Sequence, residues 1–187
     1  MKLDDVYNEF LQKMISEGYS QNDIVFGNGN VDADVVLIGE APGKEEVEKK
    51  IPFVGKAGKI LDEFLEKTGI KRHDLFVTNT VKFRPYKISE KGTVSNRPPT
   101  VTEIELCANC LENELVCISP KLIITLGNVP LKSILADKKV TIGDYHGRLV
   151  NTPHGKLFPL YHPASIIYNR SLKSVYEKDL EMLSSII

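Results

Sequence analysis

The sequence predicts an α/β fold in which a mostly parallel β-sheet carries helices on both faces. Three short apolar runs, at residues 35–38, 75–78 and 122–126, have the composition of strands covered on both sides. Stretches with helical spacing of apolar residues separate these runs. Strands that alternate with helices form parallel sheets, because each helix carries the chain back to the edge where the next strand starts.

Helical spacing of apolar residues recurs along the chain. In the first predicted helix, residues 4–17, Val6, Phe10 and Met14 fall on one face, and Gly18 ends the pattern. The other predicted helices are residues 57–68, 102–118, 131–135 and 172–187. Thr102 and Glu105 have the spacing of a capping box, which predicts the start of the third helix.

The remaining segments are predicted as strands and loops. Residues 147–151 and 157–160 flank a turn at Pro153, His154 and Gly155, and the second of them is the last strand. Residues 82–99 are polar and rich in proline and lysine, which predicts a surface loop.

Length and composition favour one globular domain. We expect residues 1–187 to form a single domain, with the helix at residues 1–18 as an appendage. Hydrophobic residues make up 42% and charged residues 26%, which argues against a disordered chain. The formal net charge of −1 excludes a simple polycation and leaves a locally basic face open.

Location and assembly are also predicted from composition. No apolar run is long enough for a membrane span, and the first residues carry acids where a signal peptide would be apolar. The 3 cysteines all lie between Cys107 and Cys117, an odd number that argues against a disulfide framework. We therefore expect a cytoplasmic monomer with reduced thiols.

Polar residues stand directly after three predicted strands. Glu40 lies in the tight loop 39–43, Asn79 follows the second strand, and His162 follows the last, held extended by Pro163. Ligands bind beyond the carboxyl ends of parallel strands, so these residues are candidates for a site. Each residue also has an interpretation without function: the loop of Glu40 as a plain turn, Asn79 as a turn former, and His162 as a structural histidine. A nucleotide phosphate loop is excluded, because GxxxxGK followed by Ser or Thr is missing.

The residue types at these positions suit recognition of a pyrimidine. The Asn79 amide offers an acceptor beside its donors, which matches the N3–H and O4 of a uracil edge. A histidine such as His162 can donate a hydrogen bond to developing negative charge. Phe53 is either a core plug or an exposed stacking face, and the residue type alone favours the plug.

Four motifs together resemble the family 4 uracil-DNA glycosylases. They are GEAPG at 39–43, PFVGKAG at 52–58, NTVKFRP at 79–85 and YHPASIIYN at 161–169. The resemblance runs from about Val25 to the C-terminus, in the order of the family. It implies a three-layer α/β/α sandwich with a central four-stranded, mostly parallel sheet.

The resemblance also implies roles for individual residues. Glu40 would orient or activate water, and His162 would stabilise the departing base. Phe53 would stack on the extruded base and Asn79 would read its edge, with further substrate contacts at Gly39 and Ala41. The expected DNA-contacting residues are Lys56, Lys82, Arg84, Ser165, Ile166, Ile167 and Arg170.

The implied function is base excision repair by a monofunctional hydrolase. The enzyme would flip uracil out of DNA and hydrolyse its N-glycosidic bond, leaving an abasic site. No lysine or cysteine nucleophile is evident in the motifs. Two alternatives stay open: a glycosylase for another deaminated base such as hypoxanthine or xanthine, and a catalytically weak module that binds damaged or single-stranded DNA.

The cysteines depart from the family, which is known for an iron–sulfur cluster held by four cysteines. Here the chain before Val25 contains no cysteine and position 83 is Phe, so that only Cys107 matches a ligand position. We therefore expect no cluster and no other metal, with Phe83 filling the volume of the cluster. Cys107, Cys110 and Cys117 are predicted to be buried thiols that pack as small hydrophobic groups.

Overall fold

The computed structural model describes residues 1–187, apart from the side chain of Ile167. Its helices are α1 (Leu3–Ser16), α2 (Lys44–Lys49), α3 (Lys56–Thr68), α4 (Val101–Ile118), α5 (Asn128–Leu135), α6 (Ile142–Tyr145), α7 (Pro163–Tyr168) and α8 (Lys173–Ser184). Its strands are β1 (Asn28–Gly29), β2 (Val35–Gly39), β3 (Leu75–Asn79), β4 (Tyr86–Ile88), β5 (Val94–Asn96), β6 (Leu122–Leu126), β7 (Val150–Thr152) and β8 (Gly155–Leu160). Single 3-10 turns occupy Gln21–Asp23, Arg72–Asp74 and Arg170–Leu172.

A mixed sheet forms the centre of the molecule, in the strand order β1-β3-β2-β6-β8-β7. The inner strands β3, β2, β6 and β8 are parallel, and β1 and β7 run antiparallel at the two edges. The mostly parallel character of the sheet is confirmed. The sheet has 6 strands, however, where four were expected. The extra edges are short, and β1 consists only of Asn28 and Gly29, which carry no apolar pattern.

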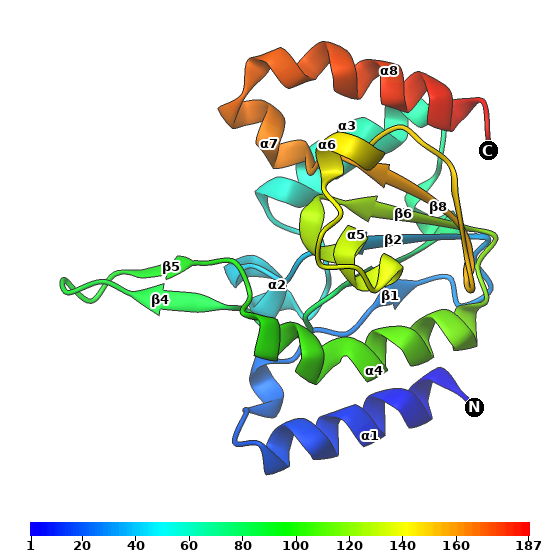
Figure 1. The fold of residues 1–187 in the computed structure, drawn as a ribbon. Coiled ribbons are helices and arrows are strands. Elements are labelled where there is room, and N and C mark those ends of the chain that lie inside the picture. The colour runs from blue at the N-terminus through cyan, green and yellow to red at the C-terminus, as the bar shows by residue number, and fades with distance from the viewer.

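Both faces of the sheet are covered by helices, as the apolar strands require. Leu37 and Phe158 pack on one side with residues of α3 and α8, among them Phe64. Val36 and Ile123 pack on the other side with residues of α4 and α5. Figure 1 shows the layers, with α8 and α3 above the sheet and α4 below it. Each large apolar side chain buried in this way stabilises the fold by about 1.5–3 kcal/mol.

Helix α1 packs on the outer side of α4 (Figure 1). Val6, Phe10 and Met14 are buried in a cluster that also contains Phe83 and Cys107. The N-terminal helix, which we expected to be an appendage, is therefore part of the packed body. Among the described residues, no helix is both long and apolar enough to cross a membrane.

Two local predictions were wrong. The predicted surface loop at residues 82–99 starts in the buried core and then forms the hairpin β4–β5. The capping box of α4 is made by Thr100 and Glu103 rather than by Thr102 and Glu105, because the Thr100 hydroxyl accepts from the Glu103 N–H. Both sites share the spacing T-x-x-E, so the spacing alone predicts two possible starts.

Candidate active site

A cleft of about 710 Å³ opens at the carboxyl-terminal edge of the sheet. Glu40, Phe53, Asn79 and His162 all line it. Glu40 follows β2, Asn79 is the last residue of β3, and His162 lies between β8 and α7. Phe53 comes from the loop between α2 and α3. Residues that lie far apart in the sequence thus meet in one place, because parallel strands end at a common edge.

Glu40 is half-buried at the tip of the loop that follows β2. The loops after β2 and β3 remain joined beyond the strands: the Thr80 N–H donates to the Gly39 carbonyl (2.9 Å), and the Val81 N–H donates to the Glu40 carbonyl (3.0 Å). Burial raises the pKa of the Glu40 carboxyl. Ala41, a predicted substrate contact, also lines the cleft.

Phe53 is held in the left-handed region of the backbone, with φ of 57°. Gly58 makes room for it, since a Cβ there would lie 1.9 Å from the Phe53 carbonyl oxygen. On the other side, a Cβ on Gly39 would lie 2.4 Å from the Phe53 ring and 2.5 Å from Asn79 Oδ1. Phe53 is 6% exposed and packs in the cluster of Leu37, Phe64 and Phe158, which we call the main core. It also lines the cleft. It is therefore a buried core residue that also contributes to the wall of the cleft.

His162 caps the N-terminus of α7 with its side chain. The Ala164 N–H donates to Nδ1 of His162 at 3.2 Å, so Nδ1 is the unprotonated nitrogen and Nε2 carries the hydrogen of the neutral ring. Burial lowers the pKa of His162, which favours the same neutral form. The Ser165 hydroxyl donates to the His162 carbonyl at 2.6 Å. The ring thus has a fixed tautomer with one N–H left to donate.

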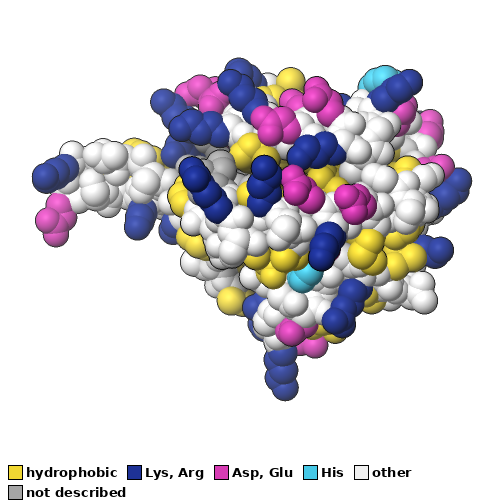
Figure 2. All heavy atoms as spheres, turned by 90° about the horizontal axis from the view of Figure 1, so that it is seen from above, with side chains coloured by type: hydrophobic (Ala, Val, Ile, Leu, Met, Phe, Trp, Pro, Cys, Tyr) yellow, Lys and Arg dark blue, Asp and Glu magenta, His cyan; other side chains and the backbone are white. Residues whose placement is uncertain are grey.

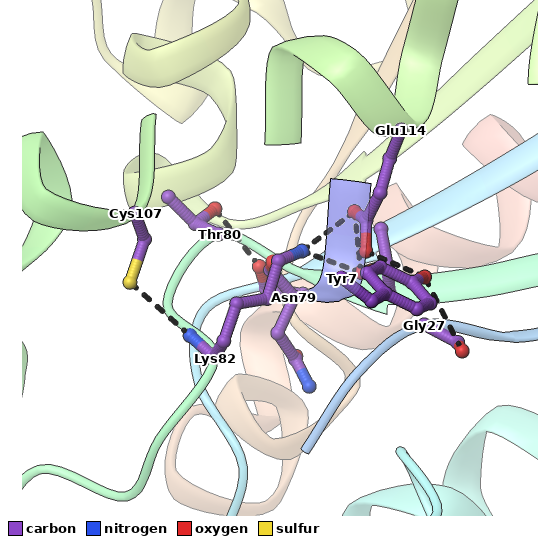
Figure 3. Close-up of polar contacts among 9 residues, drawn as sticks. Tyr7, Gly27, Asn79, Thr80, Lys82, Cys107 and Glu114 are labelled. Atoms are coloured by element: carbon purple, nitrogen blue, oxygen red, sulfur yellow. Dashed lines mark hydrogen bonds and ion pairs between the residues drawn. The ribbon is translucent and has the colours of Figure 1, made fainter. Parts of the chain in front are cut away.

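Lys82, predicted to contact DNA, is completely buried. Figure 3 shows its ammonium within a polar network beneath the end of β3. It donates to the Asn79 carbonyl (2.7 Å), the Thr78 hydroxyl (2.7 Å) and Glu114 Oε2 (2.6 Å). The prediction was wrong because the long side chain turns inward to a buried carboxylate, which compensates its desolvation.

The network continues from Glu114 to the outer helix α1. The Tyr7 hydroxyl donates to Glu114 Oε1 at 2.9 Å (Figure 3). Burial, followed by the charge of Glu114, raises the pKa of Tyr7 well above its usual range, so it stays a donor. Through Lys82, this chain of bonds links α1 and α4 to the backbone of Asn79.

Glu46 is a site residue that the sequence analysis did not single out. Its carboxylate is buried and accepts three backbone N–H groups, from Gly43 (3.0 Å), Val54 (3.1 Å) and Gly55 (2.8 Å). It therefore joins the loop of Glu40 to the loop of Phe53. The available signal was the three-residue spacing from Gly43 to Glu46, which is that of a capping box at the start of the unpredicted helix α2.

The other expected DNA contacts are placed unevenly. Lys56 and Arg84 line the cleft, and Arg170 is exposed in the turn before α8. Ile166 is half-buried and packs against the main core, whereas Tyr168 is 90% exposed and lines the cleft. The side chain of Ile167 lies outside the described residues.

The environment of Cys107 does not fit an iron–sulfur cluster. Cys107 and Cys110 are buried in an apolar cluster with Phe83, and Cys117 is half-buried. Burial raises the pKa of Cys107, and that of Cys110 to about 12, so both are protonated as free thiols. Among the described side chains, no group of three or more Cys, His, Asp or Glu could hold a metal ion.

The model of the uracil DNA glycosylase superfamily matches residues 26–183. The chain therefore belongs to this superfamily of N-glycosylases. A type-4 uracil-DNA glycosylase of Thermotoga maritima is 36% identical over 171 residues, covering 90% of this chain and 85% of that protein. A type-4 uracil-DNA glycosylase of Archaeoglobus fulgidus is 34% identical over 192 residues, covering 98% and 92%.

A solved structure shares the fold. The crystal structure of SMUG2 from Pedobacter heparinus matches with a TM-score of 0.52, covering 95% of this chain and 96% of that one. Its sequence identity is 15%, so this likeness concerns the fold alone.

Proposed function

We propose that this chain is a monofunctional uracil-DNA glycosylase of base excision repair. The observation that carries the proposal is the meeting of Glu40, Phe53, Asn79 and His162 in one cleft at the strand ends. The type-4 uracil-DNA glycosylases among its relatives support uracil as the substrate. The target base must first leave the duplex, at a cost of a few kcal/mol of stacking and pairing.

Base recognition falls to Phe53 and Asn79. Phe53, which lines the cleft, provides an apolar contact for the ring of the base. The Asn79 amide accepts from the uracil N3–H and donates to O4. Because Lys82 holds the Asn79 carbonyl, the amide is presented from a fixed backbone.

The reaction breaks the bond between C1′ of the sugar and N1 of uracil. The electron pair leaves with the base, and negative charge develops on uracil O2. The His162 Nε2–H donates to that oxygen more strongly as the bond breaks, which lowers the barrier. The Glu40 carboxylate favours the cationic sugar and takes a proton from the water that attacks C1′, leaving an abasic site.

The DNA would be held by basic and exposed side chains around the cleft. Lys56 and Arg84 lie at the cleft, where phosphate contacts are needed to position the strand. We assign the filling of the gap left by the base to Tyr168, since among the described side chains of α7 it is the exposed one, whereas Ile166 packs inward.

We also propose that the fold needs no iron–sulfur cluster. Phe83, Cys107 and Cys110 pack as apolar side chains against α1, around the position where the resemblance implies a cluster. The stabilisation that a cluster would supply comes instead from burial of these side chains.

Alkali-sensitive cleavage of labelled oligonucleotides tests the proposed function. The parent should release uracil and leave an alkali-labile site, while thymine at the same position stays intact. Asn79→Ala should reduce uracil release at least 100-fold, because the variant leaves the N3–H and O4 of uracil without their hydrogen-bond partners. Faster release of hypoxanthine or xanthine would replace uracil as the substrate, and binding without release of any base would support a binding module.

A further inference from the structure

A hairpin made of β4 and β5 projects from the body beside the cleft (Figure 1). Its strands are antiparallel, with Ile88 opposite Val94. The turn is closed by backbone bonds from the Ser89 N–H to the Thr93 carbonyl (3.0 Å) and from the Gly92 N–H to the Ser89 carbonyl (2.9 Å). The segment is therefore a formed arm with its own hydrogen bonds.

The root of this arm is fixed to helix α4. The Arg97 guanidinium makes two bonds of 2.7 Å to the Glu103 carboxylate. The Arg97 Nε donates to the Tyr86 carbonyl at 3.1 Å, and its backbone N–H donates to the Pro85 carbonyl at 3.1 Å. Bidentate pairs of this kind fix direction as well as distance, so the arm leaves the body at a defined angle.

One face of the arm is apolar and exposed. Tyr86 and Ile88 share this face because side chains alternate along a strand, and Val94 joins them from the partner strand. Their exposed fractions are 52%, 63% and 47%. A two-stranded hairpin cannot bury such residues by itself, and a contiguous exposed apolar patch marks a binding surface.

The arm is also basic, although the chain as a whole is not. Residues 84–97 contain Arg84, Lys87, Lys91 and Arg97 against the single acid Glu90, a formal charge of +3 in a chain of −1. Basic side chains are seen on the arm and around its junction with the body in Figure 2. Within the part of the chain that the structure describes, no ion pair engages Arg84, Lys87 or Lys91.

The apolar face meets the cleft at Val94, which belongs to both. Arg84, Val94 and Asn96 belong to the hairpin or its root and line the same cleft as Phe53 and His162. The Arg84 Nε donates to Asn96 Oδ1 at 2.6 Å, which keeps both side chains on this wall. A strand with one nucleotide in the cleft would pass Arg84 and reach the apolar face.

We propose that the hairpin binds the unpaired DNA strand beside the extruded nucleotide, with Tyr86 and Ile88 against base faces and Lys87 and Lys91 near phosphates. This inference rests on the proposed function, since it takes the cleft to hold an extruded base. Aromatic and apolar side chains combined with cations bind single strands without regard to sequence. A duplex hides its base faces and offers mainly phosphates to such a surface, which would leave the apolar face unused.

Fluorescence anisotropy with an undamaged single strand and the matching duplex tests the arm directly. The apolar variant is Tyr86→Ser with Ile88→Ser, and the charge variant is Lys87→Gln with Lys91→Gln. The matched control is Lys71→Gln with Lys156→Gln, which removes two exposed lysines at the amino-terminal ends of β3 and β8. Melting curves check that each variant is folded.

The apolar variant should bind the single strand at least tenfold more weakly, with duplex affinity changed less than about threefold. For single-strand binding, the charge variant should reduce the slope of log K against log salt by about 1.4, which is about 0.7 for each lost phosphate contact. The control should leave this slope unchanged. Single-strand binding at parent affinity in the apolar variant overturns the proposal, as does an equal loss for duplex.

The excision assay separates this inference from the proposed function. If the parent releases uracil while the hairpin variants bind single strands like the parent, only the role of the arm is refuted. If the apolar variant loses single-strand affinity while the parent releases no base from any strand, the arm is supported and the glycosylase activity fails.

Discussion

The ring of His162 receives a hydrogen bond from the Ala164 N–H on Nδ1, and this bond exists only while that nitrogen is unprotonated. Protonation would place two donors face to face at the start of α7 and add a positive charge at the positive end of the helix. The neutral donor form is therefore built into the backbone, in agreement with the lowered pKa.

His162→Ala should reduce the rate of uracil release in single turnover by about 100- to 1,000-fold, the usual loss for one donor to a developing anion. His73→Ala, which removes an exposed histidine that does not line the cleft, serves as the control and should stay within tenfold. Release by His162→Ala at the parent rate would show that this ring does not act on the base.

Glu40→Gln should raise the melting temperature near neutral pH while abolishing uracil release. The pKa of Glu40 is raised in the folded state, so its ionised form lowers stability above the folded pKa, and this cost is lost as the pH falls to its ordinary value of 4.5. We therefore expect a gain in melting temperature at neutral pH that shrinks as the pH falls and is lost below pH 4.5. The exposed Glu45→Gln is the control. A pH-independent difference would contradict this account.

Lys82→Met should lower the free energy of unfolding by about 3–5 kcal/mol, because it leaves the Glu114 carboxylate buried without its partner. Lys56→Met, at the exposed rim of the cleft, should change it by less than about 0.5 kcal/mol and weaken DNA binding instead. Urea unfolding and anisotropy measure the two effects. A stable Lys82→Met with weakened DNA binding would restore the original expectation of a DNA contact.

At the scale of elements, the loop from β2 and the loop before α3 are held together by one carboxylate. Glu46→Ala should lower the free energy of unfolding by about 1.5–3 kcal/mol. It should also reduce kcat/KM by about 10- to 100-fold, because Glu40 and Phe53 lose their fixed spacing. Glu48→Ala is the control from the same helix, since Glu48 makes an exposed pair with Lys44 and does not line the cleft. Equal effects of the two substitutions would show that Glu46 does not position the loops.

The main helices and strands were predictable because their apolar spacing reflects burial. The stripe of α3 and the apolar runs of β2, β3 and β6 are buried as the patterns require. In the hairpin β4–β5 the alternation of Tyr86, Lys87 and Ile88 is too short to predict a strand, because each strand has only 3 residues, all of them exposed. Strands held by their own backbone bonds, with no face on a core, cannot be recognised from periodicity.

At the scale of the whole molecule, the site was predictable because the rule for parallel sheets is geometric. Any polar residue that ends an inner strand reaches the same edge, so Glu40, Asn79 and His162 converge. The direction of a long side chain follows no such rule. Lys82 is near the cleft in sequence yet turns into the core, because its partner Glu114 comes from a helix 32 residues further along the chain.

Treatment with an iron chelator should leave the melting temperature of the protein unchanged. We proposed that the fold needs no cluster, because Phe83 and Cys107 pack in an apolar cluster with their neighbours from α1. The purified protein should therefore be colourless, and prolonged treatment with a chelator should shift neither its melting temperature nor its rate of uracil release. Phe10→Ala, which creates a cavity in the same cluster of side chains, should lower the free energy of unfolding by about 3–5 kcal/mol. Visible absorption or a chelator-dependent loss of stability would refute a cluster-free fold.

The backbone conformation of Phe53 is unusual for an aromatic residue. A left-handed φ suits glycine or asparagine, and an aromatic residue there is strained by roughly 1–3 kcal/mol. If the position served only to turn the chain, the smaller residues would do so at lower cost. Burial of the ring, which is 6% exposed and packs in the cluster of Leu37 and Phe64, offsets this strain, so that core packing holds the side chain at the wall of the cleft.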